Sequence, residues 1–411
     1  MGGAGGARVI PRLRPAFDGA ELAAAMRPGS PDDVPAFEQA FAAAFEARDA
    51  VAFPYGRTAL KALLHALELK DAEVIAPSYT CVVVQHATLL SGNVPVFVDN
   101  TMTDYNMDLD RLAAAIGPRT GAVLATHLFG FPLDVDRFRA IICEAEQRFG
   151  RKIWVVQDCA HAFGARWKGR LVCNEGDAAL FGLNISKMLS SIFGGMLTFT
   201  DQGLAAKVRA WRDRNLKPAT AARSARRLAY LLATYPAFAR GPYRLVHFLQ
   251  YRTSLLDRLT RAYHLDDEVR FPPDAHEQML PIEARVGRVQ LEKRDAIVRR
   301  RRQIAARYST GLAGVPGWVL PPLVEGATYS HYPVRVPDRK ATVDHFAARG
   351  VHLGEVVEYS VAHLRAYTQF AVAQKFPNSL YCSRHMVNLP IHPQLRDADV
   401  DRVIAIAREI R

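Results

Sequence analysis

IWVVQDCAH, residues 153–161, decides the fold class of this 411-residue chain. A short apolar run of β-prone residues leads into Gln157 and Asp158, which is typical of a buried strand that ends on a carboxylate. Open α/β sheets bind ligands beyond the carboxyl ends of their strands. Asp158 is therefore a candidate site residue, although a carboxylate in this position equally often caps the following helix.

Similar apolar runs recur on both sides of this stretch, between Val51 and Thr200. Helical patterns separate them, and the clearest one follows Gly56, where leucines recur at i, i+3, i+4 and i+7. Strands that alternate with helices predict an α/β domain with a largely parallel sheet. The runs are VAF at 51, VIA at 74, VPVFVD at 94, AVLA at 122, IWVVQD at 153, AALFG at 178 and MLTFT at 196.

The second half of the chain predicts a long helix and a smaller α/β unit. Residues 282–312 place apolar positions beside a dense charged face, which indicates one long helix. HYPVRV at 331 and VNLPI at 387 are the expected strands, and residues 398–410 form the last helix after an acidic first turn. We expect four parts: an N-terminal segment (1–50), a large domain (51–204), an insertion (205–280) and a C-terminal domain (281–411).

Bulk properties favour a cytosolic protein. The glycine-rich start lacks the apolar core of a signal peptide, and 18 apolar residues never run together. Five scattered cysteines without a C-x-x-C pair predict neither a disulfide framework nor a metal site. The formal charge of +12 is concentrated between Ala205 and His264, where 13 Lys or Arg face only two Asp. A single basic segment without a recognised binding module argues against nucleic acid as a partner.

Lys187 is the second candidate, in the stretch LFGLNISKMLSSIFGGMLTF at 180–199. Most lysines are solvated surface charges. Here an apolar neighbourhood is expected to lower the pKa of the amine, and a neutral amine is the form that attacks an aldehyde. The pair Gly194 and Gly195 would permit a close backbone approach, although a plain hairpin explains these glycines equally well.

A third candidate is YGRTAL, residues 55–60, where a strand passes into a helix. The amides of Arg57, Thr58 and Ala59 would lie at the helix N-terminus, which favours phosphate, and the hydroxyl of Thr58 would add a donor. Turns of this kind are also common without any ligand.

Several blocks of the chain together resemble the DegT/DnrJ/StrS family of sugar aminotransferases, which are fold-type I pyridoxal-phosphate enzymes. The resemblance runs from about Ile10 to Arg411 and has one long interruption. Its blocks, in order, are residues 74–100, 116–136, 157–170, 184–200, 282–308 and 388–404. It implies a large domain with a mostly parallel seven-stranded sheet, and a smaller C-terminal α/β domain.

The resemblance also implies roles for individual residues. Lys187 would be the Schiff-base lysine and would carry the proton during transfer. Asp158 would hold the pyridine nitrogen of the cofactor, and His161 would lie near its phenolic oxygen. Other members bind the cofactor phosphate and the sugar at the positions here held by the Arg57 amide with Thr58, and by His331, respectively.

This chain departs from the family pattern at several positions. Cys81 stands where members commonly stack an aromatic ring on the cofactor, so Cys81 itself, Tyr79 or His127 would have to fill that place. Gly182 replaces a phosphate-binding serine, five residues before the lysine. Gln278 lies where relatives bring an asparagine from the partner subunit, but it does not match their pattern. A weaker phosphate site is expected.

The implied reaction transfers an amino group, from glutamate, to a keto group of a nucleotide-activated sugar in a homodimer whose active sites lie at the subunit interface. Two alternatives are open. One is a pyridoxal-phosphate enzyme that acts on a non-sugar ketone such as an inosose, or on a lipid-linked ketone. The other is a binding protein that keeps the fold without turnover.

The basic insertion allows three interpretations. Relatives need only a few tens of residues where about 80 separate Thr200 from Pro281. Its helices could pack on the dimer with arginines in solvent or over the substrate channel. They could instead form an amphipathic face, within 205–264, that lies on an anionic membrane and makes the protein membrane-peripheral. A positive funnel for a nucleotide diphosphate is the third.

Overall fold

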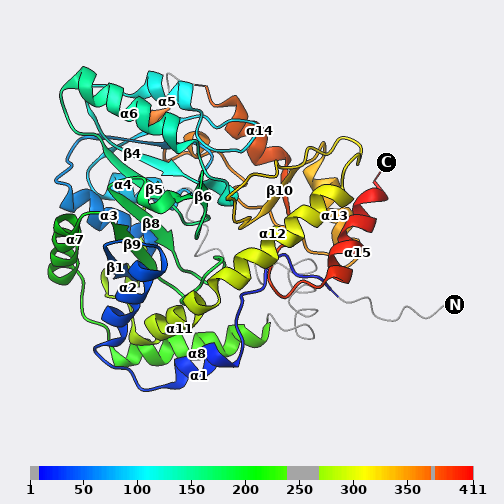
Figure 1. The fold of residues 1–411 in the computed structure, drawn as a ribbon, viewed down its shortest axis with the longest axis horizontal. Helices are drawn as coiled ribbons and strands as arrows, with labels where there is room; N and C mark the ends of the chain where they lie inside the picture. The colour runs from blue at the N-terminus through cyan, green and yellow to red at the C-terminus, as the bar shows by residue number, and fades with distance from the viewer. Residues whose placement is uncertain (1–8, 238–267, 372–374, 411) are drawn as a thin grey trace.

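The computed structural model describes residues 9–237, 268–371 and 375–410, built around a seven-stranded sheet (Figure 1). The strand order is β1-β9-β8-β5-β4-β2-β3, and only β9 runs antiparallel to its neighbours. The predicted α/β class and mostly parallel sheet are confirmed, and each apolar run became a strand. The strands are β1 (Asp49–Phe53), β2 (Glu73–Pro77), β3 (Val94–Val98), β4 (Thr120–Thr126), β5 (Trp154–Asp158), β8 (Ala178–Gly182) and β9 (Gly195–Phe199).

Helices cover both faces of the sheet because its strands are apolar on both sides. Val74 of β2 packs with α3 (Gly56–Ala66) and α7 (Gln202–Asn215), whereas its neighbour Ile75 packs on the opposite face with α5 (Leu109–Ala115) and α6 (Val135–Phe149). The predicted helix after Gly56 is confirmed, since Leu60, Leu63 and Leu64 are fully buried. The helix α4 (Val83–Leu90) lies beside α3.

The predicted long helix is wrong in one respect, because it is broken at Lys293. The chain forms α11 (Pro281–Glu292) and α12 (Arg294–Gly311), which follow one another diagonally from the larger unit to the smaller one (Figure 1). α11 packs on α1 (Gly19–Met26) and α2 (Asp33–Ala44). At the break, Lys293 Nζ pairs with Asp18 (2.8 Å) and Glu21 (2.6 Å) at the start of α1.

The smaller unit contains both predicted C-terminal strands as an antiparallel pair, β10 (Tyr332–Arg335) with β11 (Met386–Leu389). The predicted last helix is α15 (Asp397–Arg408), whose N-terminus is capped by Asp399. The second half also contains α13 (Arg339–Ala348) and α14 (Pro377–His385). A separate hairpin of β6 (Arg166–Trp167) and β7 (Arg170–Leu171) follows β5.

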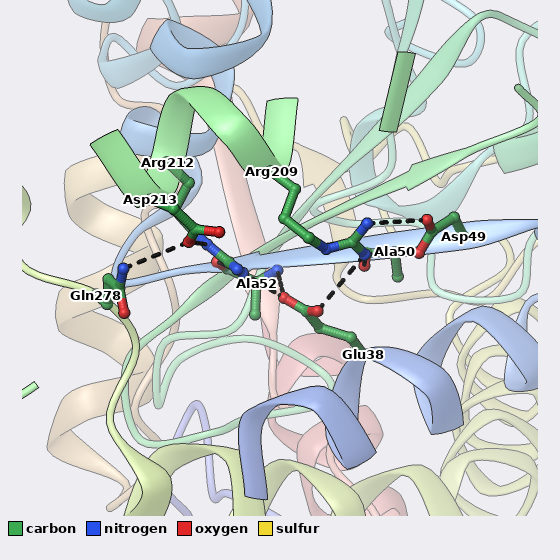
Figure 2. A network of polar contacts seen from close by, with 8 residues as sticks. All are labelled: Glu38, Asp49, Ala50, Ala52, Arg209, Arg212, Asp213 and Gln278. Atoms are coloured by element: carbon green, nitrogen blue, oxygen red, sulfur yellow. Dashed lines mark hydrogen bonds and ion pairs between the residues drawn. The ribbon is translucent and has the colours of Figure 1, made fainter. Parts of the chain in front are cut away.

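A polar network fastens the edge strand β1 to two helices (Figure 2). The buried carboxylate of Glu38, on α2, accepts from the Ala52 amide at 2.8 Å and from Arg212 of α7 at 2.5 Å. Arg209, one turn earlier on α7, donates to Asp49 at 2.8 Å. Burial raises the pKa of Glu38, and the two arginines oppose that rise. The network therefore binds exposed groups of the edge strand that would otherwise be open to pairing.

Candidate active site

Asp158 lies where the sequence placed it, as the last residue of β5. Its side chain is only 4% exposed, and one oxygen accepts from the Ala160 amide at 3.1 Å. Burial raises the pKa of this carboxyl, while the Ala160 amide, the charge of Lys187 and the hydroxyl of Thr126 counteract the rise. A buried carboxylate at the carboxyl end of a parallel strand is well placed to hold a cationic ligand nitrogen.

Lys187 lies in the loop between β8 and β9, and its side chain folds over the end of β8. A Cβ atom placed on Gly182 would be 3.3 Å from Lys187 Cε. Burial lowers the pKa of the amine, as the sequence predicted, and the nearby Cys81 and Asp158 oppose that change. The structure thus brings Lys187, Asp158 and Cys81 into one electrostatic neighbourhood, from the end of β5 and from the loops after β8 and β2.

Gly195, the second glycine after Lys187, makes a close backbone approach, and the pair also leads into the antiparallel pairing of β9 with β8, so the structure agrees with both sequence interpretations. A Cβ atom on Gly195 would lie 2.4 Å from the Gly56 nitrogen, a distance that no side chain tolerates. A Cβ atom on Gly56 would in turn be 3.7 Å from Gly182 Cα. The N-terminus of α3 is therefore pressed against the ends of β8 and β9, directly beside the lysine.

The phosphate candidates Arg57 and Thr58 both lie in the first turn of α3, but they differ in how they are bound. The hydroxyl of Thr58 donates to the carbonyl of Ala275 at 3.1 Å, so it is engaged within the protein. The amides of Arg57 and Thr58 keep their favourable position for an anion, whereas the Ala59 amide donates to the Tyr55 carbonyl at 3.1 Å. The side chain of Arg57 is half-buried and lies 5.9 Å from the ring centre of Tyr55.

The two histidine candidates meet each other above the sheet. The ring centres of His161 and His331 are 4.8 Å apart, and both rings also contact Phe129. Burial lowers the pKa of both histidines well below its ordinary value, and Lys187 adds to the effect. Two neutral imidazoles therefore face the lysine. Phe129, which the sequence did not single out, holds a positive φ of 58° in the turn after β4.

Of the residues considered for the ring stack, only Cys81 is accessible. Tyr79 is fully buried and packs edge-on against Phe129 in the core. His127 is equally buried, and its two ring nitrogens bond to Gln157 (2.8 Å) and to the Leu133 amide (3.0 Å). Burial accordingly lowers the pKa of His127 to about 4. The half-buried thiol of Cys81 remains the group beside Lys187 that a ring could meet.

The described part of the basic segment ends at Ala237, the last residue of α8 (Ala221–Ala237). Several of its arginines have acidic partners. Arg209 and Arg212 belong to the network of Figure 2. In α8, Arg223 pairs with Asp274 and Glu277, and Arg227 pairs with Asp274 and the buried Glu283. These four positive charges are structural. The expected helix break at Pro236 and residues 241–242, and most of the proposed amphipathic face, lie outside the described residues.

The ion pair between Arg227 and Glu283 predicts a pH-dependent stability. The two side chains are 2.7 Å apart, and burial raises the pKa of Glu283 to about 7. A raised pKa means that folding takes up a proton between the unfolded value and about 7, so this carboxyl's contribution to stability falls as pH rises through that window. Arg227→Met would raise the pKa further and extend the fall above pH 7. We expect a loss of about 3 kcal/mol at pH 8 and a smaller one at pH 5.5.

Urea unfolding of the wild type and of Arg227→Met, at pH 8 and at pH 5.5, measures the loss of stability at each pH. Arg226→Met is the matched control, since Arg226 is the exposed neighbour on the same helix. The guanidinium carbon of Arg227 also lies 4.1 Å from the ring centre of Phe193, and the contribution of this contact to stability does not depend on pH. An equal loss at both pH values would therefore assign the effect to packing and contradict the predicted ion pair.

Three further observations concern the structure outside this site. A cavity of about 750 Å³ lies apart from it, between α1, α8 and the start of α11, and Gln278 lines that cavity and contacts Asp213 at 3.4 Å (Figure 2). Across residues 9–237, 268–371 and 375–410, no three His, Cys, Asp or Glu side chains are grouped to hold a metal ion. In the same ranges no helix has the length and apolar character needed to cross a membrane.

Comparison with known proteins gives a consistent result. The SpsC protein of Bacillus subtilis, a spore coat polysaccharide biosynthesis protein, is 28% identical over 91% of this chain and 88% of its own length. GDP-perosamine synthase of Caulobacter vibrioides is 28% identical over 91% of this chain and 89% of its own. A Streptococcus pneumoniae protein assigned as a sugar aminotransferase, solved in a PLP form, has the same fold, with a TM-score of 0.74 at 21% identity over 98% of this chain and all of its own.

The sequence profile of the DegT/DnrJ/EryC1/StrS aminotransferases matches residues 26–232 and 263–408. The unmatched residues between these two ranges, 233–262, fall inside the insertion expected at 205–280, so α7 and most of α8 belong to the family pattern. The profile also spans the loops that carry Asp158 and Lys187, together with the whole seven-stranded sheet. The predicted membership is thus confirmed, and the chain belongs to the DegT/DnrJ/EryC1/StrS family of pyridoxal-phosphate-dependent aminotransferases.

Proposed function

We propose that the protein transfers an amino group, from glutamate, to a keto group of a nucleotide-activated sugar. The observation that supports this most is the position of Lys187, folded over Gly182 and beside the N-terminus of α3, with Asp158 in the same neighbourhood. The similarity to GDP-perosamine synthase supports a nucleotide-linked sugar as the acceptor.

The residues of the site fit pyridoxal phosphate. The amides that open α3 suit a phosphate, and Arg57 Nη1 beside them is buried without a hydrogen bond to the described residues. Asp158 can hold a protonated pyridine nitrogen, and Lys187 can bind the aldehyde carbon. When bound there, the cofactor supplies an electron sink for the carbon that gains or loses the amino group.

Lys187 has two tasks in this account. Its lowered pKa keeps a fraction of the Nζ amine neutral, which is the form that can bind a carbonyl carbon. When Nζ is free, it would be placed to act as the base that takes a proton from the amine-bearing carbon of the substrate and later gives it back. Asp158 assists by remaining ionised beside the cationic nitrogen, since an opposite charge lowers the pKa that burial has raised.

The neutral His161 and His331 are suited to hydroxyl groups rather than to charges. Each neutral imidazole offers one donor and one acceptor, which matches a sugar hydroxyl or the phenolic oxygen of the cofactor. We assign His161 to the cofactor side, because its backbone follows Asp158 by three residues, and His331 to the sugar. Phe129 stacks on the ring of His161 and meets the ring of His331 edge-on.

Substrate profiling tests the proposed acceptor. The purified enzyme would be given glutamate with nucleotide-linked keto sugars, the corresponding sugars without the nucleotide, and an inosose, while the formation of 2-oxoglutarate is followed. We expect kcat/KM for a nucleotide-linked sugar to exceed that of the others by about 100-fold, the contribution of two or so charged hydrogen bonds. A preference for the inosose, or for a keto sugar without the nucleotide, would contradict the proposal.

We also propose that the protein acts as a homodimer in the cytoplasm. A peripheral contact of residues 205–264 with anionic membranes is a separate proposal, and the ion pairs of Arg209, Arg212, Arg223 and Arg227 reduce the charge available for it. Sedimentation with anionic vesicles at low and high salt tests that contact. Binding that salt does not weaken, or no binding, would remove it.

A further inference from the structure

The first turn of α3 carries a guanidinium that lacks an acceptor in the described chain. Arg57 Nη1 is buried and makes no hydrogen bond to residues 9–237, 268–371 or 375–410. Burial lowers the pKa of this guanidinium, and the neighbouring titratable groups that oppose this change are Cys81, Tyr55 and Tyr359. A guanidinium stays charged in proteins, so a buried N–H without an acceptor is costly unless a ligand supplies one.

Asp274, which binds the hydroxyl of Tyr55 beside this turn, is already paired with two other arginines. Asp274 accepts from the hydroxyl of Tyr55 at 2.8 Å and pairs with Arg227 at 3.3 Å and Arg223 at 3.6 Å. Arg57 therefore adds its full charge to the positive end of the α3 dipole. An anion at this turn would therefore be attracted by the Arg57 guanidinium and by the positive end of the α3 dipole.

Two positions that could offer a hydroxyl group to an anion at this turn do not do so. Thr58 donates its hydroxyl to the carbonyl of Ala275, and Gly182 has no side chain. A Cβ atom on Gly182 would already be 3.3 Å from Lys187 Cε, so a larger residue there would press on the lysine. The guanidinium of Arg57 is consequently the strongest side-chain donor that this turn offers.

The same turn lies within reach of the reactive lysine. Gly56 approaches Gly182, over which Lys187 is folded, and the Cys81 thiol neighbours both Arg57 and Lys187. One small molecule can therefore contact the α3 amides, Arg57 and Lys187 at once. An anion held by Arg57 would be part of the molecule that Lys187 binds.

We propose that the guanidinium of Arg57 binds the phosphate of pyridoxal phosphate, together with the amides of the first turn of α3. This inference rests on the proposed function. A guanidinium can donate two parallel hydrogen bonds to a phosphate, which an ammonium cannot reproduce. Arg57 thereby supplies cofactor affinity that Thr58 and Gly182 do not.

The test compares pyridoxal phosphate with pyridoxal, which has the aldehyde but no phosphate. Both would be titrated into the cofactor-free full-length enzyme, and dissociation constants measured from the quenching of protein fluorescence. We expect Arg57→Gln to weaken pyridoxal phosphate by about 10- to 100-fold and to change pyridoxal by less than about twofold. Arg57→Lys should fall between the wild type and Arg57→Gln. Arg288→Gln, an exposed arginine on α11, is the matched control.

A second measurement guards against a folding defect. Inorganic phosphate should raise the thermal midpoint of the cofactor-free wild type and of Arg288→Gln, but not that of Arg57→Gln, while all three keep the same circular dichroism spectrum. The proposal would be overturned if Arg57→Gln lost affinity equally for pyridoxal phosphate and for pyridoxal, or if it lost affinity for neither. An unchanged constant for pyridoxal phosphate with a raised half-saturating glutamate concentration would also overturn it and assign Arg57 to a substrate carboxylate.

The outcomes also separate this inference from the proposed function. If the wild type binds neither aldehyde through Lys187, the proposed active site itself is wrong. If the wild type binds both aldehydes and Arg57→Gln binds them equally well, only the proposed role of Arg57 is wrong.

Discussion

Lys187→Ala should lower the rate of amino transfer by about 10⁴-fold or more. The change removes the amine that binds the cofactor and the base that moves the proton, and no second lysine is assigned to the site. The fold should survive, because the loop is held by backbone bonds such as the one from Lys187 N to the Asn184 carbonyl at 2.9 Å. Single-turnover assays with excess enzyme, cofactor and glutamate measure the effect without interference from product release.

Two controls make this result specific to the amine. Lys70→Ala removes an exposed lysine between α3 and β2 and should react at the wild-type rate. A small primary amine added to Lys187→Ala should restore part of the lost rate, because it can replace Nζ as a base. A variant that keeps more than about a tenth of the wild-type rate would show that another group moves the proton.

Asp158→Asn should lower the same rate by about 10²- to 10³-fold, the usual effect of removing one charged partner from a buried reaction centre. Asparagine has nearly the same shape, and its carbonyl oxygen can still accept from the Ala160 amide, which Asp158 binds at 3.1 Å. What disappears is the negative charge that holds a proton on the cofactor nitrogen. The cofactor should therefore still bind, but act as a poorer electron sink.

Stopped-flow absorbance of the glutamate half-reaction measures this loss, with Asp71→Asn as an exposed control. The loss should lie in the rate at saturating glutamate rather than in the glutamate concentration that saturates it. A wild-type rate in Asp158→Asn would mean that the ring nitrogen is held by another group.

The features that sequence reasoning predicted well are those determined by local pattern. Continuous apolar runs between helical patterns fixed the strands, and a carboxylate after such a run was bound to lie at a strand end, as Asp158 does. Gly195 could be identified for the same reason, because a glycine pair before a strand permits an approach that any Cβ would block. The lowered pKa of Lys187 followed from its apolar neighbours.

The features that it missed depend on contacts between distant parts of the chain. The hydroxyl of Thr58 is bound by Ala275, more than 200 residues away, and nothing near Thr58 indicates this. The partners of Arg223 and Arg227, which are Asp274, Glu277 and Glu283, likewise lie far along the chain from α8, so the charge of these arginines looked like a solvated surface. The break at Lys293 coincides with ion pairs to the start of α1, which helical periodicity does not record.

The central claim is that Lys187 is the residue to which the cofactor is attached. Its most direct test is to load the full-length wild type with pyridoxal phosphate, reduce it with borohydride, digest it and locate the added mass by peptide mass spectrometry. The account predicts one modified lysine, Lys187, and no modification when glutamate is added before reduction, since the amino group has then displaced the lysine. Modification of a different lysine, or no modification under loading conditions, would contradict it and leave the chain as a binding protein with the fold of an aminotransferase.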